Sequence, residues 1–305
     1  MNRKLVCALL VFLHFLFTLP HTKSFAQEKS ISELNLPVKY EELTAPEFAK
    51  AVKLSDGVCI LPIGILEKHG PHLPLGTDML DCRELALQAA KKEYSIVFPE
   101  YYFGQIYEAK HQPGTIAYSA ELVWNILQET CEELARNGLK KIIIVNGHGG
   151  NRFFLHYFCQ AQLASRKDYA VVLFRPESDP TVAEKVKALR KTVEDGHAGE
   201  TETSMMLYHR PDLAHVERGK DQSGENLKRL DHLPYVFTGI WWYARYPNHY
   251  SGDGSQANPK IGELLLNSRA DQLSDLIGKF KKDNKVLRLQ REFFNNAEKP
   301  LKTKQ

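Results

Sequence analysis

Two continuous apolar runs constrain the fold of this chain more than any other feature. Residues 58–65 read VCILPIGI and residues 140–145 read KKIIIV, without alternation between apolar and polar positions. Such runs are typical of strands covered on both faces, as in a parallel sheet between layers of helices. With shorter runs of the same kind, the sequence predicts four strands, at 57–65, 95–98, 141–145 and 170–174.

Helical patterns separate these strands. Apolar residues recur at helical spacing over 79–93, 120–137, 152–165 and 181–191, and again over 261–282. Alternation of buried strands and helices predicts βαβ units. We therefore expect an α/β fold with three α/β/α layers around a mostly parallel sheet. Its domain is predicted at 45–294, after a polar lead-in at 27–44 and before a frayed tail at 295–305.

Potential metal ligands follow the first predicted strand. Glu67 and His69 come directly after it, and Asp78 begins the next helical pattern after a loop that contains Pro and Gly. Ligands bind at the carboxyl ends of strands in open α/β sheets, and residues two apart on extended backbone point the same way. Each residue alone is more often a solvated loop side chain. Together, behind a strand, they favour a shared metal site.

A second histidine-containing turn follows the strand predicted at 141–145. Residues 146–151 read NGHGGN and place His148 at that strand's end, where glycines let the backbone turn sharply. Taken alone, this turn is more often a phosphate-binding or structural loop, yet it lacks the Lys-Ser/Thr of a P-loop. Combined with Glu67, His69 and Asp78, it indicates a metal-dependent hydrolase.

Five blocks of the sequence resemble the creatininase (creatinine amidohydrolase) family and occur in the family's order. They are residues 62–74, 77–78, 111–115, 146–151 and 196–204. The resemblance implies a dinuclear amidohydrolase in which Glu67 and His148 bind one metal, His69 binds the other and Asp78 bridges both. Such oxygen and imidazole ligands suit two divalent ions, with Zn expected first and Mn or Fe(II) as alternatives. The resemblance also implies a homo-oligomer, often a hexamer.

The chain departs from the creatinine-cleaving members at one place. Those members carry Tyr and Glu after the metal-binding histidine, where this chain has Gly149 and Gly150. The family Glu is a ligand of the second metal, so here we expect Glu202 in that role, with Glu200 as the alternative. His197 is predicted to be the general acid that protonates the departing nitrogen. The alternative for His197 is a capping or core histidine.

The predicted function is hydrolysis of a non-peptide C–N bond, in a small-molecule cyclic amide or formamide, by a metal-bound hydroxide. Two alternatives stay open: creatinine amidohydrolase proper, and a non-catalytic periplasmic module that binds a metal or ligand on the same fold. His72 and His111 are expected to orient ligands or line the pocket. The aromatic stretch 236–254 is expected to line the pocket or an oligomer contact, with core packing as the alternative.

Residues 1–26 read as a cleaved signal peptide, with a charged start, an apolar stretch and Ser24-Phe25-Ala26 before the cut. We expect a periplasmic or secreted protein without a stable membrane anchor, because the stretch is shorter than the roughly 20 residues that span a bilayer. Cleavage lowers Lys plus Arg from 40 to 37, which equals the 37 Asp plus Glu. A neutral chain without a basic stripe argues against nucleic-acid partners.

Four cysteines remain after that cut, at Cys59, Cys82, Cys131 and Cys159. An oxidising compartment permits disulfides among them. Their positions on predicted strands and helix faces equally suit buried free thiols.

Overall fold

The computed structural model describes residues 35–303, all within one compact unit. The signal peptide predicted at 1–26 lies outside these residues. The strands are β1 (Val58–Ile63), β2 (Ile96–Val97), β3 (Lys141–Asn146) and β4 (Ala170–Leu173). The helices are α1 (Ala45–Leu54), α2 (Thr77–Lys92), α3 (Ala120–Arg136), α4 (Asn151–Ala161), α5 (Pro180–Leu189), α6 (Glu200–His209), α7 (Trp241–Arg245), α8 (Pro259–Lys282) and α9 (Lys285–Ala297).

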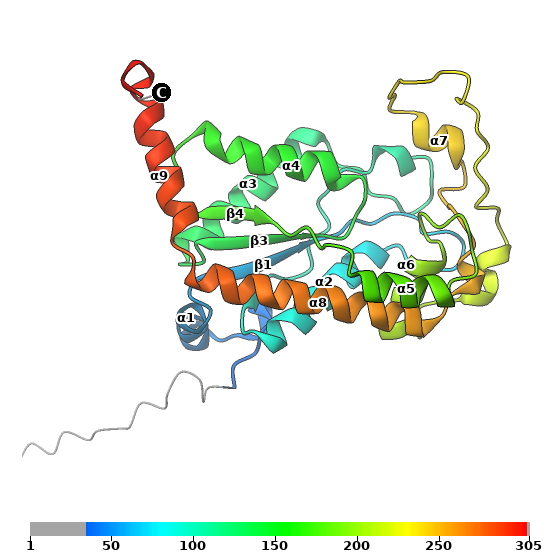
Figure 1. Cartoon of the computed structure of the whole chain (residues 1–305), viewed down its shortest axis with the longest axis horizontal. Helices are drawn as coiled ribbons and strands as arrows, with labels where there is room; N and C mark the ends of the chain where they lie inside the picture. The colour runs from blue at the N-terminus through cyan, green and yellow to red at the C-terminus, as the bar shows by residue number, and fades with distance from the viewer. Residues whose placement is uncertain (1–34, 304–305) are drawn as a thin grey trace, which may run out of the picture. The chain divides into compact units, whose positions relative to one another are not determined.

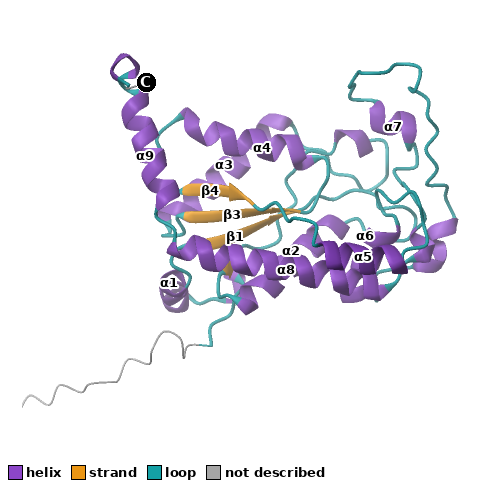
Figure 2. Ribbon diagram, in the orientation of Figure 1, coloured by secondary structure: helices purple, strands orange, loops and turns teal. Residues whose placement is uncertain are grey.

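The four strands form one parallel sheet in the order β2-β1-β3-β4. Figure 2 shows β1, β3 and β4 side by side in this sheet. In its centre, Ile60 of β1 pairs with Ile143 of β3, and Ile63 pairs with Asn146. The chain leaves β1 toward β2 on one side and reaches β3 on the other, so the order reverses between β1 and β3. Ligands bind at such a reversal, beyond the carboxyl ends of the strands.

Helices cover both faces of the sheet, which confirms the predicted three-layer α/β/α fold (Figure 1). Side chains of β1 alternate between the layers: Ile60 packs with α2 and α8, while Leu61 packs with α3 and α4. Because both faces are covered, all six residues of β1 are buried. The unbroken apolar run of the sequence is therefore explained by its position in the sheet.

Several elements were absent from the predictions. Helices α1, α6, α7 and α9 were not foreseen, and α9 continues to Ala297, beyond the predicted start of the tail. In α6 the apolar residues do not form one stripe, which removes the periodic signal that reveals a helix. The expected polar lead-in also differs, because Leu36, Val38 and Tyr40 pack against the core.

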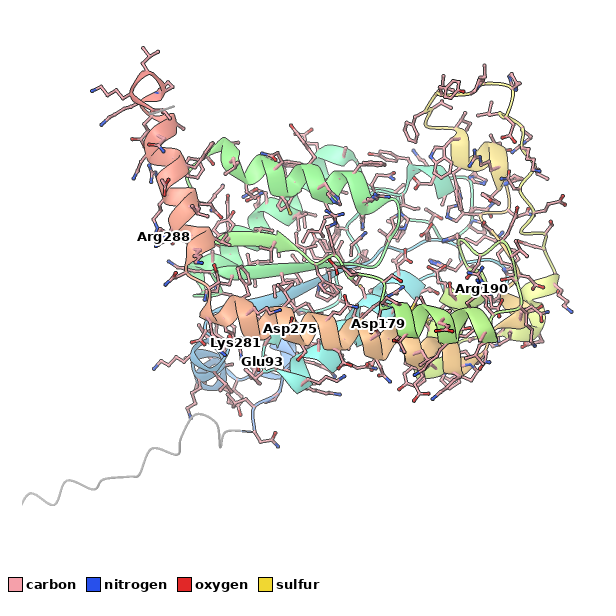
Figure 3. The ribbon with its side chains drawn as sticks, in the orientation of Figure 1. Glu93, Asp179, Arg190, Asp275, Lys281 and Arg288 are labelled. Atoms are coloured by element: carbon pink, nitrogen blue, oxygen red, sulfur yellow. The ribbon has the colours of Figure 1, made fainter. Side chains whose placement is uncertain are left out.

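The long helix α8 is tied to α2 at the end of the sheet opposite to the predicted site. Lys281 of α8 and Glu93, the residue after α2, form an ion pair of 2.5 Å (Figure 3). The Lys141 side chain donates a hydrogen bond to the Lys281 carbonyl. These contacts join α8 to β3 and α2 and keep the helix across one face of the sheet.

All four cysteines of the described part are free thiols. Cys59, Cys82 and Cys131 are buried in the core, and Cys159 is partly buried. Burial as small apolar side chains is therefore what the fold shows. Between residues 35 and 303, no helix combines the length and the apolar character that crossing a membrane requires.

Candidate metal centre

The predicted ligands lie where β1 and β3 end and α2 begins. Two glycines allow this approach: a Cβ at Gly64 would lie 2.3 Å from the Met79 backbone nitrogen, and one at Gly147 would lie 2.3 Å from the Asp78 carbonyl oxygen. Any side chain at either position would push α2 away. The first turn of α2, with Asp78 in it, therefore sits directly against both strand ends.

The side chains of Glu67, His69 and Asp78 meet at this point. Glu67 and His69 are completely buried, and Asp78 is 2% exposed. The Nε2 atom of His69 lies 3.0 Å from Oδ1 of Asp78. The loop between them is fixed in part by the Glu67 backbone nitrogen, which donates to the Leu75 carbonyl at 3.0 Å.

His148 enters the same cluster from the turn after β3. Its Nδ1 lies 2.8 Å from Oε1 of Glu67 and 3.0 Å from Oδ2 of Asp78. The Asn146 side chain fixes the backbone of His148. It accepts a hydrogen bond from the His148 backbone nitrogen at 3.2 Å and donates one to the His148 carbonyl at 2.8 Å. The glycine-containing turn therefore serves to aim an imidazole.

Glu202 joins the cluster from the first turn of α6, whereas Glu200 does not. Oε1 of Glu202 lies 3.9 Å from Nε2 of His69. The Glu200 carboxylate accepts hydrogen bonds from the backbone nitrogens of Lys191 and Thr192 at 2.7 to 2.9 Å. Of the two acidic candidates, the structure brings only Glu202 to the other predicted ligands.

Three groups of side chains have ligand atoms that all lie within 4.8 Å of one another: Glu67, Asp78 and His148; His69, Asp78 and Glu202; and Glu67, His69 and His197. Asp78 joins the first two groups, which together contain the five predicted ligands. Oε1 of Glu67 and Oδ2 of Asp78 are buried without a hydrogen-bond partner, although His148 lies close to each. Unsatisfied buried carboxylate oxygens facing an imidazole fit a divalent cation.

The carboxylates of Glu67, Asp78 and Glu202 lie close together, so bound protons or cations must balance their negative charge. Burial lowers the pKa of His69, but the carboxylates of Asp78, Glu202 and Glu67 together outweigh burial and raise that pKa to about 10. Burial also opposes protonation of His148, yet Glu67 and Asp78 raise its pKa well above the usual value. Burial, with a smaller contribution from Asp78, raises the pKa of Glu202 to about 7. Without cations, protons balance these carboxylates; divalent cations would do so in their place.

His197 lies beside the cluster, in the turn before α6. Its Nε2–H donates to the Lys68 carbonyl at 2.7 Å, and its Nδ1 lies 3.8 Å from Oε2 of Glu202. Burial lowers the pKa of His197 to about 3, so the ring is neutral. A neutral imidazole cannot begin as an acid. In the predicted role, Nδ1 must therefore accept a proton before it can donate one.

His72 and His111 do not contact the cluster. His72 is buried and pairs through Nε2 with the hydroxyl of Thr203 in α6 at 2.8 Å. His111 is exposed, and its Nε2 donates to the Pro247 carbonyl at 2.9 Å. Both histidines fix loops around the site rather than a ligand itself.

Two further residues at the cluster were not predicted from the sequence. His249 is 2% exposed and forms a hydrogen bond through Nε2 with Oε2 of Glu67. Glu108 lies with Oε1 4.0 Å from Nε2 of His148, and a Cβ at Gly150 would lie 2.6 Å from that oxygen. Glu108 thus occupies space that a side chain at position 150 would need. Their proximity to Glu67 and His148 comes from the tertiary fold and left no local signal.

Comparisons with known proteins agree with this geometry. A family model described as "Creatininase: Creatinine amidohydrolase" matches residues 41–277. A creatinine amidohydrolase of Pseudomonas putida is 28% identical over 257 residues, which cover 77% of this chain and 94% of that protein. A 2-amino-5-formylamino-6-ribosylaminopyrimidin-4(3H)-one 5'-monophosphate deformylase of Methanothermus fervidus is 30% identical over 241 residues, 73% of this chain and 83% of that protein.

A similar structure has also been solved. The structure titled "Creatininase Mn" has a TM-score of 0.68 and 25% sequence identity to this chain. The match covers 81% of this chain and 100% of that one.

Proposed function

Since the chain belongs to the creatininase family, we propose that it is a metal-dependent amidohydrolase that cleaves the C–N bond of a cyclic amide or a formamide. The observation that carries this proposal is the position of Asp78, whose carboxylate is common to the group that contains His148 and the group that contains Glu202. In the proposed centre, Glu67 and His148 would hold one divalent cation, His69 and Glu202 would hold the other, and Asp78 would contribute to both sites.

The proposed ligand set defines what the metals contribute. Two divalent cations, Zn²⁺ or Mn²⁺, would lower the pKa of a bound water toward 7 and polarise the substrate carbonyl. The protein's part is to hold the carboxylates and the imidazoles in place, and bound cations would displace the protons that these groups carry. Burial of Glu67, His69, Asp78 and His148 supports this role, because it excludes competing water from four of the five proposed ligands.

Proton transfer is assigned to His197. Its Nε2–H is committed to the Lys68 carbonyl, which leaves Nδ1 free on the side that faces Glu202. Nδ1 takes the proton from the attacking water and delivers it to the departing nitrogen as the C–N bond breaks. The hydrogen bond to Lys68 keeps the ring in the tautomer that this transfer requires.

The turn that carries His148 supports the proposed substrate class. Gly149 and Gly150 stand where creatinine-cleaving members carry Tyr and Glu, and Gly149 has open space where a side chain would stand. This favours an amide other than creatinine. The deformylase of Methanothermus fervidus is a relative whose name states a formamide substrate, which supports testing formamides first.

A metal-reconstituted substrate screen tests the proposal. The protein is stripped with a chelator, reloaded with Zn²⁺ or Mn²⁺, and incubated with formamides, lactams, creatinine and small peptides. We expect two metal equivalents per chain and turnover of a formamide or lactam that disappears on chelation. Preferred creatinine turnover would support creatinine amidohydrolase proper. One equivalent or none, without turnover of any compound, would support the binding module instead.

The location and assembly belong to the same proposal. The pattern at residues 1–26 supports export and cleavage after Ala26, and the family resemblance supports a homo-oligomer. N-terminal sequencing of the protein from a periplasmic or culture fraction should begin at Gln27. Light scattering of the purified protein measures the assembly. An intact N-terminus in the cytoplasmic fraction would contradict export.

A further inference from the structure

The buried imidazole of His249 connects the cluster to helix α7. On one side, its Nε2 forms a hydrogen bond with Oε2 of Glu67. On the other side, the indole Nε1 of Trp242 in α7 donates to its Nδ1 at 2.8 Å. The ring also lies against His197, with ring centroids 4.4 Å apart. His249 therefore contacts a proposed ligand, the proposed proton carrier and a separate helix.

The chemistry of the indole fixes the direction of both hydrogen bonds. An indole nitrogen is only a donor, so Nδ1 of His249 must be the acceptor. The neutral imidazole then carries its proton on Nε2, and this N–H donates to Oε2 of Glu67. Trp242, His249 and Glu67 are thus joined by two consecutive hydrogen bonds, in which each donor has one acceptor.

These two hydrogen bonds give the two carboxylate oxygens of Glu67 different surroundings. Oε2 accepts from His249, whereas Oε1 has no hydrogen-bond partner and lies 2.8 Å from Nδ1 of His148. Rotation of the carboxylate would exchange the oxygens and break the bond to His249. Oε2 is therefore bound to His249, and Oε1 faces Asp78 and His148.

The backbone around His249 is held by residues from two other motif blocks. The Pro247 carbonyl accepts from the side chains of His111 at 2.9 Å and Gln112 at 2.8 Å. The Asn248 carbonyl accepts from the Lys68 ammonium at 2.7 Å. His249 itself has a φ of +52°, which is uncommon for a residue other than glycine. These contacts keep a strained residue in place, which is typical of a functional position.

We propose that His249 is a positioning residue that selects Oε1 of Glu67 as the metal-binding oxygen, and that Trp242 acts through it. The inference rests on the proposed metal centre. It makes the affinity for the cation depend on α7, a helix that supplies none of the proposed ligands. Removing a hydrogen-bond partner of a ligand in this way commonly weakens metal binding by about 10- to 100-fold.

Two substitutions that differ by one methylene group test the role of His249. Asparagine tolerates the positive φ, but its amide ends too short to reach Glu67. Glutamine places its N–H near the position of Nε2. Mn²⁺ titration of the metal-free protein should show about 10-fold or weaker affinity for His249→Asn. His249→Gln should stay within about threefold of the native protein, as expected when the hydrogen bond is restored. The control His156→Asn, at an exposed position on α4, should leave the affinity unchanged.

A second variant covers the case in which His249→Asn does not fold, as judged by thermal unfolding of the metal-free protein. Trp242→Phe keeps an aromatic ring and removes only the indole N–H. It should lower the Mn²⁺ affinity by about 2- to 10-fold, the usual effect of one neutral hydrogen bond.

The outcomes separate this inference from the proposed function. Native affinity in folded His249→Asn, or equal losses in His249→Asn and His249→Gln, overturns the positioning role while the metal centre stands. Native affinity in Trp242→Phe overturns the part assigned to Trp242. If the native protein itself binds no Mn²⁺ or Zn²⁺, the metal centre fails and this inference fails with it.

Discussion

Oδ1 of Asp78, in the first turn of helix α2, lies 3.0 Å from Nε2 of His69. The other oxygen of Asp78 lies 3.0 Å from His148. One carboxylate thus faces two imidazoles that come from different strand ends, β1 and β3. This arrangement is the basis of the first prediction.

Substitution Asp78→Asn should remove both metals together. The amide has one oxygen and no charge, so neither group keeps its shared ligand, and affinity for both cations should fall by about 100-fold or more. Metal analysis of the purified variant measures this. The control is Asp81→Asn in the same helix, because Asp81 pairs with His209 at 2.6 Å rather than with the cluster. Two metal equivalents in Asp78→Asn would refute the shared role.

Substitution Glu202→Gln should remove one metal of the two. Glu202 belongs only to the group with His69 and Asp78, so the group with His148 remains complete. We expect about half of the native metal content by elemental analysis. Glu200→Gln is the matched control: its partners are the backbone nitrogens of Lys191 and Thr192, so metal content should not change. Equal metal content in both variants would contradict the assignment of Glu202.

Substitution His197→Gln should slow turnover without loss of metal. Glutamine can still donate to the Lys68 carbonyl, but it cannot carry a proton between water and the leaving nitrogen. General acid–base catalysis contributes about 10²- to 10⁴-fold, so kcat should fall within that range while KM changes little. Steady-state kinetics on the best substrate of the screen measures both constants. A native kcat would remove His197 from the mechanism.

The metal-free protein should lose stability as the pH rises above 7. The pKa of His69 is raised to about 10 in the folded protein from an ordinary value of 6.5. A raised pKa contributes stability that is complete below 6.5 and is lost as the pH rises through 10. The free energy of unfolding should therefore fall by up to about 1.4 kcal/mol per pH unit in this window.

Denaturant unfolding at pH 7 and pH 8.5, with a chelator present, measures this loss. His69→Gln should show a shallower dependence because it lacks the titrating ring. Saturating Mn²⁺ should abolish the loss, since cations compete with the protons that the ring must release. A metal-free protein whose stability rises between these pH values would show that the proton on His69 does not stabilise the fold.

Substitution Gly147→Ala should destabilise the fold at the metal centre. The new Cβ would lie 2.3 Å from the Asp78 carbonyl, so β3 and α2 would have to separate. Such overpacking commonly costs about 1–3 kcal/mol, and metal affinity should fall as well because Asp78 moves. Gly239→Ala is the control, with no atom within 4 Å of its new Cβ. Equal unfolding midpoints for the two variants would exclude this packing requirement.

Much of the fold was determined by the sequence itself. The apolar runs at 58–65 and 140–145 identified β1 and β3, because strands covered on both faces need apolar side chains at every position. Helix α6 left no such signal, although it carries Glu202, since its buried side chains are not arranged in one apolar stripe. Local periodicity therefore located the sheet but not every helix around it.

The sequence also identified the proposed ligands that directly follow a strand, namely Glu67, His69 and His148, because the end of a parallel strand is a known place for such residues. Only the tertiary structure decided between Glu200 and Glu202, since both lie on the same turn of α6 and differ in the direction of their side chains. Only the tertiary structure revealed His249, which lies 182 residues from Glu67 in the chain. Short-range patterns record which backbone conformation a segment prefers; contacts between distant segments depend on how the whole chain packs.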